Sequence, residues 1–79
     1  MAARLPVKSG TQVLKTFFRV RERFQIQFKR KGKGSHVVLS NKSGRNFSVP
    51  LHNELDAGTL LKVIEDAEMT KEQFLENDP

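Results

Sequence analysis

Residues 35–49 read SHVVLSNKSGRNFSV, and this stretch decides the fold. Its two ends flank Lys42-Ser43-Gly44, a connection of the length and glycine content typical of a β-hairpin loop. We therefore predict strands at 35–41 and 45–49. If Asn41 faces Arg45, then Leu39 faces Phe47 and Val37 faces Val49, so the apolar side chains share one face of the sheet. A four-residue loop would instead shift the pairing by one residue and turn His36 inward.

A further strand is predicted before this hairpin. Phe24, Ile26 and Phe28 alternate with polar residues, which is the pattern of a half-buried strand. The basic segment Lys31-Gly32-Lys33-Gly34 then separates this strand from the one that begins at Ser35.

Helices are predicted on both sides of the strands. Ser9 and Gln12 have the spacing of a capping box, and an apolar stripe then predicts a helix over 10–21. A second helix begins between Asp56 and Thr59, and Thr70 with Gln73 predicts a capping box for a short third helix. The side chains expected to be buried on these helices are Val13, Leu14, Phe17, Phe18, Val20, Leu60, Leu61, Ile64, Ala67, Phe74 and Leu75.

This order of elements predicts an α+β domain in which the helices cover the apolar face of a three-stranded antiparallel sheet. A chain of 79 residues has only enough core for one domain, and residues 1–8 and 77–79 are expected to be loosely ordered. The other sheet face is expected to be polar, and the predicted register places on it Gln25, Gln27, Lys29, His36, Val38, Ser40, Asn46 and Ser48.

The composition excludes several kinds of site. The chain has no cysteine, so disulfides, thiolate zinc sites and cysteine nucleophiles are excluded, and the chain suits a reducing compartment. Two histidines are too few to hold a transition metal by themselves, so neither a metal nor another cofactor is expected. No stretch approaches the apolar length of a membrane span, and we expect a cytoplasmic protein.

The charge is divided unevenly along the chain. Residues 1–34 carry ten basic side chains and one acidic one, whereas residues 35–79 carry four basic and eight acidic ones. Such a basic half favours a polyanionic partner, and nucleic acid is the commonest one in a cytosol. Lys29, Arg30, Lys31 and Lys33 form its densest cluster. A solvated basic surface without a partner remains the alternative.

The aromatic residues argue against one mode of RNA binding. All six phenylalanines fall on positions predicted to lie in the core, and the chain has neither Tyr nor Trp. Modules that stack bases on a sheet need exposed rings there, so we do not expect recognition of that kind.

His36 is the strongest candidate for chemistry. Histidine is the side chain that can take up and return a proton near neutral pH, and this one is predicted on a polar sheet face beside the basic segment. An RNA strand brings its own nucleophile, the 2′-hydroxyl, so a proton carrier and positive charge are sufficient for cleavage. The register places His52 near His36, either as a second acid or base or as a structural loop residue. A purely structural His36 is the alternative.

Two other arrangements are weaker. Ser35 and His36 are neighbours on a strand and point to opposite faces, so they cannot form a nucleophile and base pair. Glu65, Asp66 and Glu68 cluster on the polar side of a predicted helix, where a solvated face is the better interpretation.

Short motifs along nearly the whole chain resemble the HicA toxins of type II toxin–antitoxin systems. In order, they are Leu5-Pro6-Val7, Ser9-Gly10, Gly34-Ser35-His36, Val49-Pro50-Leu51-His52, Gly58-Thr59-Leu60 and Phe74-Leu75. The resemblance implies a fold like that of double-stranded-RNA-binding domains, cleavage of mRNA, and neutralisation by a HicB antitoxin that covers the active site. It also implies that His36, after its Gly-Ser pair, is catalytic. The chain departs from the family at Arg23, where a glycine often stands.

From these observations we expect a metal-independent endoribonuclease that cleaves mRNA, with His36 as general acid and base and His52 as a second or structural histidine. RNA is expected to contact Lys29, Arg30, Lys31, Lys33, Gln25, Gln27 and Ser48, and Val38 is expected to contact the antitoxin. A non-catalytic RNA-binding module is one alternative. A protein that acts on operator DNA only through its antitoxin complex is another.

Overall fold

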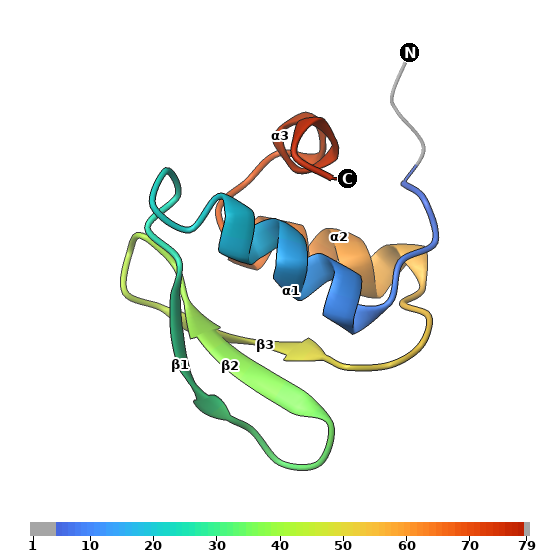
Figure 1. The fold of residues 1–79 in the computed structure, drawn as a ribbon, viewed down its shortest axis with the longest axis horizontal. Coiled ribbons are helices and arrows are strands. Elements are labelled where there is room, and N and C mark those ends of the chain that lie inside the picture. Colours follow the sequence, from blue (N-terminus) through green and yellow to red (C-terminus); the bar gives the residue numbers. More distant parts are fainter. Residues whose placement is uncertain (1–4, 79) are drawn as a thin grey trace.

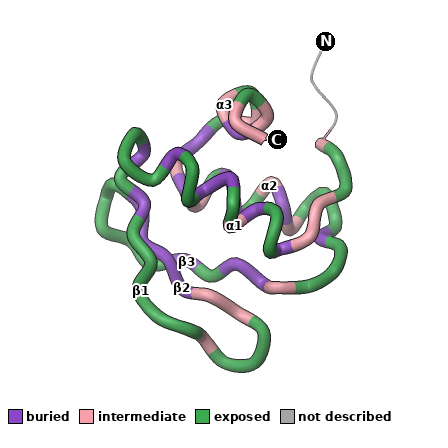
Figure 2. The backbone as a smooth tube through the Cα atoms, in the orientation of Figure 1, coloured by how far each residue is buried: buried purple, intermediate pink, exposed green. Residues whose placement is uncertain are grey.

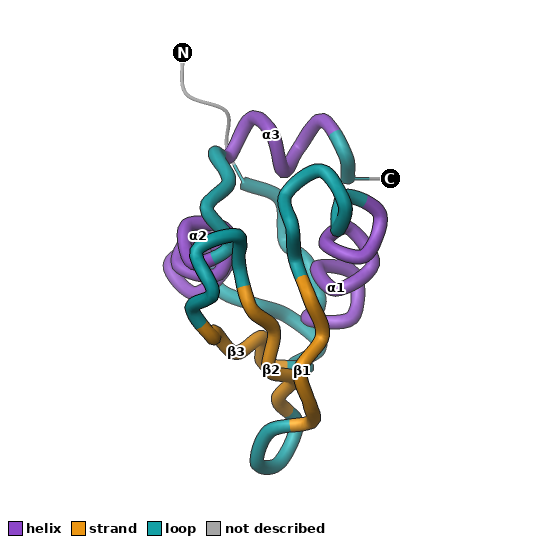
Figure 3. Tube along the Cα trace, turned by 90° about the vertical axis from the view of Figure 1, so that its left-hand side faces the viewer, coloured by secondary structure: helices purple, strands orange, loops and turns teal. Residues whose placement is uncertain are grey.

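A computed structural model describes residues 5–78 as three helices and a three-stranded sheet (Figure 1). The expected α+β fold, similar to that of double-stranded-RNA-binding domains, is confirmed. Its elements in chain order are α1 (Gly10–Arg19), β1 (Gln27–Lys31), β2 (His36–Ser40), β3 (Asn46–Pro50), α2 (Ala57–Asp66) and α3 (Lys71–Glu76). The helices lie on one side of the sheet, and the β1–β2 hairpin extends beyond them (Figures 1 and 3).

The β2–β3 hairpin has the predicted register. The strands are antiparallel in the order β1-β2-β3, and Leu39 pairs with Phe47 while Val37 pairs with Val49. Gly44 has a φ of +79°, a backbone conformation that residues other than glycine rarely adopt. The three-residue loop is therefore confirmed, and with it the side of the sheet on which His36 lies.

The first strand begins later than predicted, includes Lys31 of the segment predicted to separate the strands, and contains a bulge. It begins at Gln27, and its pairing with β2 shifts between Phe28 and Arg30, so that Lys29 is the extra residue and Arg30 pairs with Val38. The placement of Gln25 on a strand was wrong, because its φ of +53° puts it in the turn before β1. The bulge brings Arg30 to the same sheet face as Val38. Without it, regular alternation would place Arg30 on the opposite face, across from Val37.

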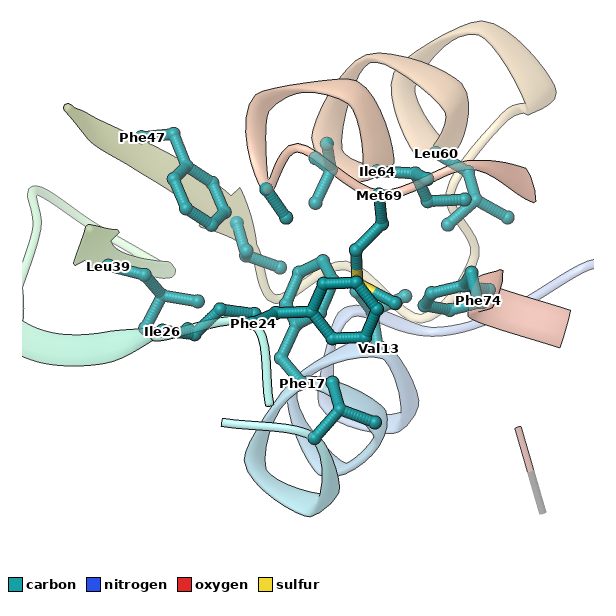
Figure 4. Close-up of a cluster of buried hydrophobic side chains, with 14 of the residues drawn as sticks. Val13, Phe17, Phe24, Ile26, Leu39, Phe47, Leu60, Ile64, Met69 and Phe74 are labelled. Carbon is teal, nitrogen blue, oxygen red and sulfur yellow. The ribbon is translucent and has the colours of Figure 1, made fainter. Parts of the chain in front are cut away.

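The core lies between the helices and the apolar sheet face (Figures 2 and 4). Phe17 is fully buried at its centre, and its ring meets the rings of Phe47 and Phe74 edge-on, with centroids 6.0 Å apart in both pairs. The prediction that every phenylalanine is buried was wrong. Phe18 and Phe28 are 51% and 45% exposed.

Helix α1 begins against the segment that follows β3. Ser9 and Gln12 form the predicted capping box, and the Gly10 backbone N–H donates to the His52 carbonyl oxygen over 3.0 Å. Gly10 packs so closely that a Cβ atom there would overlap the Pro50 carbonyl oxygen. A glycine is therefore required where α1 meets this segment.

The other two helices are also capped by side chains. Asp56 accepts a hydrogen bond from the Thr59 backbone N–H at the start of α2, and hydrogen bonding by Thr59 lowers the pKa of the Asp56 carboxyl. Thr70 and Gln73 form the predicted capping box of α3. No helix within residues 5–78 has the length and apolar character needed to span a membrane.

An ion pair joins the two ends of the described chain. Lys8 Nζ lies 2.6 Å from Asp78 Oδ2, and both side chains are largely buried, at 14% and 10% exposure. Lys8 also pairs with Leu55 through the backbone. Lys8 and Asp78 thus have defined contacts inside the segments predicted to be loosely ordered, of which residues 1–4 and 79 lie outside the described residues.

Candidate functional site

His36 opens strand β2 on the sheet face that the described helices leave uncovered. It pairs with Pro50 across the hairpin, and its Nδ1 atom lies 3.1 Å from the Lys33 carbonyl oxygen. A carbonyl oxygen only accepts, so this hydrogen bond requires the proton on Nδ1. In the neutral ring, the lone pair is then on Nε2, which is the nitrogen left to act on a ligand.

The chain around Lys33 makes this contact possible. Gly34 has a φ of +60°, so the β1–β2 connection can turn back tightly between Lys33 and His36. A Cβ atom at Gly32 would lie 3.2 Å from the His36 Cβ and 3.4 Å from Val38 Cγ2. The two glycines thus let the tip of the hairpin lie close to the imidazole.

An open hollow of about 500 Å³ surrounds His36. Its charged members come from the end of β1 and the turn after it, and its hydroxyl group comes from β3. The hollow is lined by Arg30, Gly32, Lys33, His36, Val38 and Ser48. An imidazole thus lies among two cations and a hydroxyl, which is an arrangement suited to a phosphodiester.

Val38 lines this hollow and is buried, with 7% of its surface exposed. That Val38 contacts an antitoxin stays a prediction, and only a small part of its surface is accessible to such a partner. Arg30 pairs with Val38 across the β1–β2 ladder, and a Cβ atom at Gly32 would lie 3.4 Å from Val38 Cγ2.

His52 lies next to His36, as the register predicts. The two ring centroids are 6.1 Å apart and the rings are nearly perpendicular, at 77°. The His52 carbonyl oxygen is held by the Gly10 N–H, while its side chain is exposed. Its backbone therefore supports the start of α1, and its imidazole remains accessible beside the hollow.

The predicted RNA-contacting residues divide into two groups. Arg30, Lys33 and Ser48 line the hollow with His36. Lys29, Lys31 and Gln27 are exposed along β1 outside it, and Lys29 Nζ lies 3.5 Å from Gln27 Oε1. Gln25 is exposed in the preceding turn and is not part of the hollow.

The acidic cluster at the end of α2 and in the turn after it lies elsewhere. Glu65, Asp66 and Glu68 line a separate hollow of about 330 Å³ beside the β2–β3 loop. Glu68 accepts a hydrogen bond of 2.6 Å from the Ser43 hydroxyl, so it is engaged in fastening that loop. Within residues 5–78, no three His, Asp or Glu side chains are grouped so that they could hold a metal ion.

The exposed phenylalanines were missed by the sequence analysis. Phe17 and Phe18 are adjacent on α1 and therefore point about 100° apart, so that only one of them can face a small core. That angle was the available signal for Phe18. Phe28 had no such signal, because its place in the alternating pattern matches that of a buried residue.

Comparison with protein families gives a match over residues 15–69, well over half of the chain, to the family described as the HicA toxin of bacterial toxin–antitoxin systems. The chain belongs to the HicA toxin family. The match spans β1, the basic turn and His36, which is the region that forms the hollow. As a toxin of such a system, this HicA protein has an antitoxin as its partner. No curated protein matches the chain significantly.

Proposed function

We propose that this HicA protein is an endoribonuclease that cleaves mRNA without a metal ion and is neutralised by a HicB-type antitoxin. The observation that carries the proposal is the hydrogen bond from His36 Nδ1–H to the Lys33 carbonyl oxygen, which leaves Nε2 free beside two cations. Membership of the HicA family supports the same conclusion.

The proposed reaction uses the ribose of the substrate as nucleophile. His36 Nε2 removes the proton of the 2′-hydroxyl, the 2′-oxygen attacks the adjacent phosphorus, and the bond from phosphorus to the 5′-oxygen of the next nucleotide breaks. The products are a 2′,3′-cyclic phosphate and a 5′-hydroxyl, which receives a proton. A positioned histidine contributes about 10² to 10⁴ to such a rate.

The remaining parts of the hollow support this chemistry. Arg30 and Lys33 are placed to stabilise the negative charge that grows on the phosphate oxygens as the 2′-oxygen adds. His52 is our candidate for the group that protonates the leaving oxygen, because its ring lies 6.1 Å from that of His36. Ser48 supplies a hydroxyl from β3 that can donate to a phosphate oxygen.

Positive charge along β1 supports binding of the rest of the RNA. Lys29 and Lys31 are exposed beside the hollow, together with the amide of Gln27. Each phosphate contact on single-stranded RNA adds about 0.7 to the slope of log affinity against log salt concentration. Removing one of these two lysines should reduce that slope by about 0.7.

A substrate with a single altered ribose tests the mechanism. In a chelator, the protein should cut an RNA oligonucleotide and leave a 2′,3′-cyclic phosphate, and a 2′-deoxy nucleotide at the cut position should abolish that cut. A deoxy-substituted site that is still cut would refute attack by the 2′-oxygen. RNA that is bound and never cut would instead favour the non-catalytic RNA-binding module.

The antitoxin part of the proposal is tested separately. We expect the product of a neighbouring antitoxin-like gene to form a complex with this chain on size exclusion and to block cleavage. Because the rim of the hollow is cationic, charge-reversing substitutions at Arg30 and Lys33 should weaken that complex. A complex that these substitutions leave unaffected would mean that the antitoxin binds elsewhere.

A further inference from the structure

Two phenylalanine rings form an exposed aromatic surface where the end of α1 meets β1. Phe18 of α1 and Phe28 of β1 have ring centroids 6.0 Å apart and planes inclined at 56°. The Arg21 guanidinium lies 3.8 Å from the centre of the Phe18 ring, and its Nη1 donates to the Phe18 carbonyl oxygen over 2.7 Å. Exposed aromatic rings are costly to leave in water, and here a fixed guanidinium adjoins them.

The chain segment that carries this pair is strongly cationic. Residues 15–33 contain eight basic side chains and the single acid Glu22. Within the described part of the chain, none of the eight forms an ion pair with a carboxylate, in contrast to Lys8 and Lys42. The eight are Lys15, Arg19, Arg21, Arg23, Lys29, Arg30, Lys31 and Lys33. A ligand for this surface must therefore combine negative charge with flat apolar groups.

We propose that Phe18, Phe28 and Arg21 form a stacking site for the bases of single-stranded RNA, an inference that rests on the proposed function for its substrate class. Aromatic rings and arginine planes accept any base, since every base has a flat π face. The site therefore holds RNA without demanding a sequence.

The site lies at a useful distance from the His36 hollow. The two lie on opposite faces of the sheet, because Phe28 pairs with the core residue Leu39 whereas Arg30 pairs with Val38 in the hollow. The edge strand β1 separates them, since Phe28 lies near its start and Gly32 follows its end. Four residues of strand span about 13 Å. A stacked nucleic-acid strand advances about 3.4 Å per phosphate, so about four or more nucleotides separate the cut from the stacked base as the RNA passes around the edge of β1. Lys29 and Lys31 lie between the two sites and meet the intervening phosphates.

An acidic protein segment is the other ligand with this chemistry, and strand β1 argues against it. A peptide would gain most binding energy by pairing with the free edge of β1. That strand, however, has a bulge at Lys29, and each of its residues has an exposed polar or aromatic side chain. Bulges and lysines are the devices by which sheet edges resist another strand. RNA needs no edge pairing, because its phosphates meet the lysines and its bases meet the rings.

The test measures binding without cleavage. A twelve-nucleotide oligouridine with 2′-O-methyl riboses has no free hydroxyl to attack, and a matched strand with abasic residues keeps its phosphates and loses its bases. We expect the wild-type protein to bind the first strand at least fivefold more tightly than the second, since stacking of one base is worth that factor or more.

A leucine pair removes the rings while keeping apolar side chains at both positions. The variant F18L/F28L should bind the two strands about equally, with the salt dependence of the wild type. Val7→Ala is the matched control, because Val7 is an exposed apolar side chain that lies by Glu54 and Leu55 in a different hollow. It should keep the preference for bases. Thermal melting of each variant verifies that it is folded.

The possible results separate this proposal from the proposed function. Loss of the base preference in F18L/F28L alone supports the stacking site, even if the wild-type protein proves unable to cut RNA. A folded F18L/F28L that keeps the preference overturns it, whatever the cleavage result. A variant with unchanged RNA binding and weakened antitoxin binding also overturns it and assigns the rings to a protein partner.

Discussion

Substituting Gly10 by alanine should destabilise the protein and move His52 away from His36. A Cβ atom there would overlap the Pro50 carbonyl oxygen and lie 2.7 Å from Leu51 Cα, and both are backbone atoms that cannot rotate away. Relieving such a contact costs about 1–3 kcal/mol, against a gain of about 0.5–1 kcal/mol for alanine over glycine in a helix. The net loss is at most about 2.5 kcal/mol and centres on about 1 kcal/mol, which corresponds to about 4–8 °C in Tm for a domain of this size.

Gly58→Ala is the matched control, because it changes the same atoms near the start of α2. The nearest atom to a Cβ at Gly58 is Asp56 Oδ1 at 3.7 Å, which is an ordinary contact. This variant should gain about 0.5–1 kcal/mol, and its Tm should rise by about 2–8 °C.

Thermal unfolding measures both stabilities, and nuclear Overhauser effects between the imidazole protons report how close the two histidines are. Gly10→Ala should have a lower Tm and weaker nuclear Overhauser effects between the two imidazole rings, since the Gly10 N–H donates a hydrogen bond to the His52 carbonyl oxygen. A Gly10→Ala protein as stable as the wild type, with unchanged effects between the rings, would refute this account of the contact.

Three further substitutions test how the fold is held together. Phe17→Ala should cost about 3–5 kcal/mol in chemical denaturation, because the ring is fully buried; a loss below 1 kcal/mol would contradict its central place in the core. Asp78→Ala should lower the free energy of unfolding by about 1–3 kcal/mol, because it leaves the largely buried Lys8 ammonium without its carboxylate. If Asp78→Ala lowers stability by the same amount in a Lys8→Ala protein, the two side chains are not coupled. Asp56→Ala should lower the Tm at neutral pH. The pKa of the Asp56 carboxyl is lower in the folded state, so the cap stabilises the protein fully above the carboxyl's unfolded pKa and this stabilisation is lost as the pH falls through its folded pKa. The difference in Tm between wild type and variant should therefore vanish in acid. A difference in Tm that persists in acid would contradict the assignment of Asp56 as the cap.

The β2–β3 hairpin could be predicted in detail because two independent signals agree. The loop ends in Gly44, which requires a positive φ, and the pairing of Leu39 with Phe47 places the apolar residues on one face. The same register places Pro50 opposite His36, which accounts for the correct expectation that His52 lies near it. The central geometry of the candidate site thus follows from one loop length.

Most of the predictions that proved wrong concern strand β1, where apolar and polar residues alternate although the backbone is not a regular strand throughout. The left-handed conformation of Gln25 and the bulge at Lys29 have no signature in residue type, since neither position is a glycine. The bulge matters for the candidate site, because it places Arg30 in the hollow. Val38 is buried beside Arg30 and Gly32 through the pairing of β1 with β2, and the alternation of residues within one strand does not reveal such contacts between strands.

The rate of RNA cleavage by His36→Ala tests the central claim most directly. Under single-turnover conditions in a chelator, this variant should cut RNA about 10² to 10⁴ times more slowly than the wild type, while its RNA affinity and Tm stay near the wild-type values. A folded His36→Ala protein that cuts RNA at the wild-type rate would contradict the claim that this imidazole carries the proton.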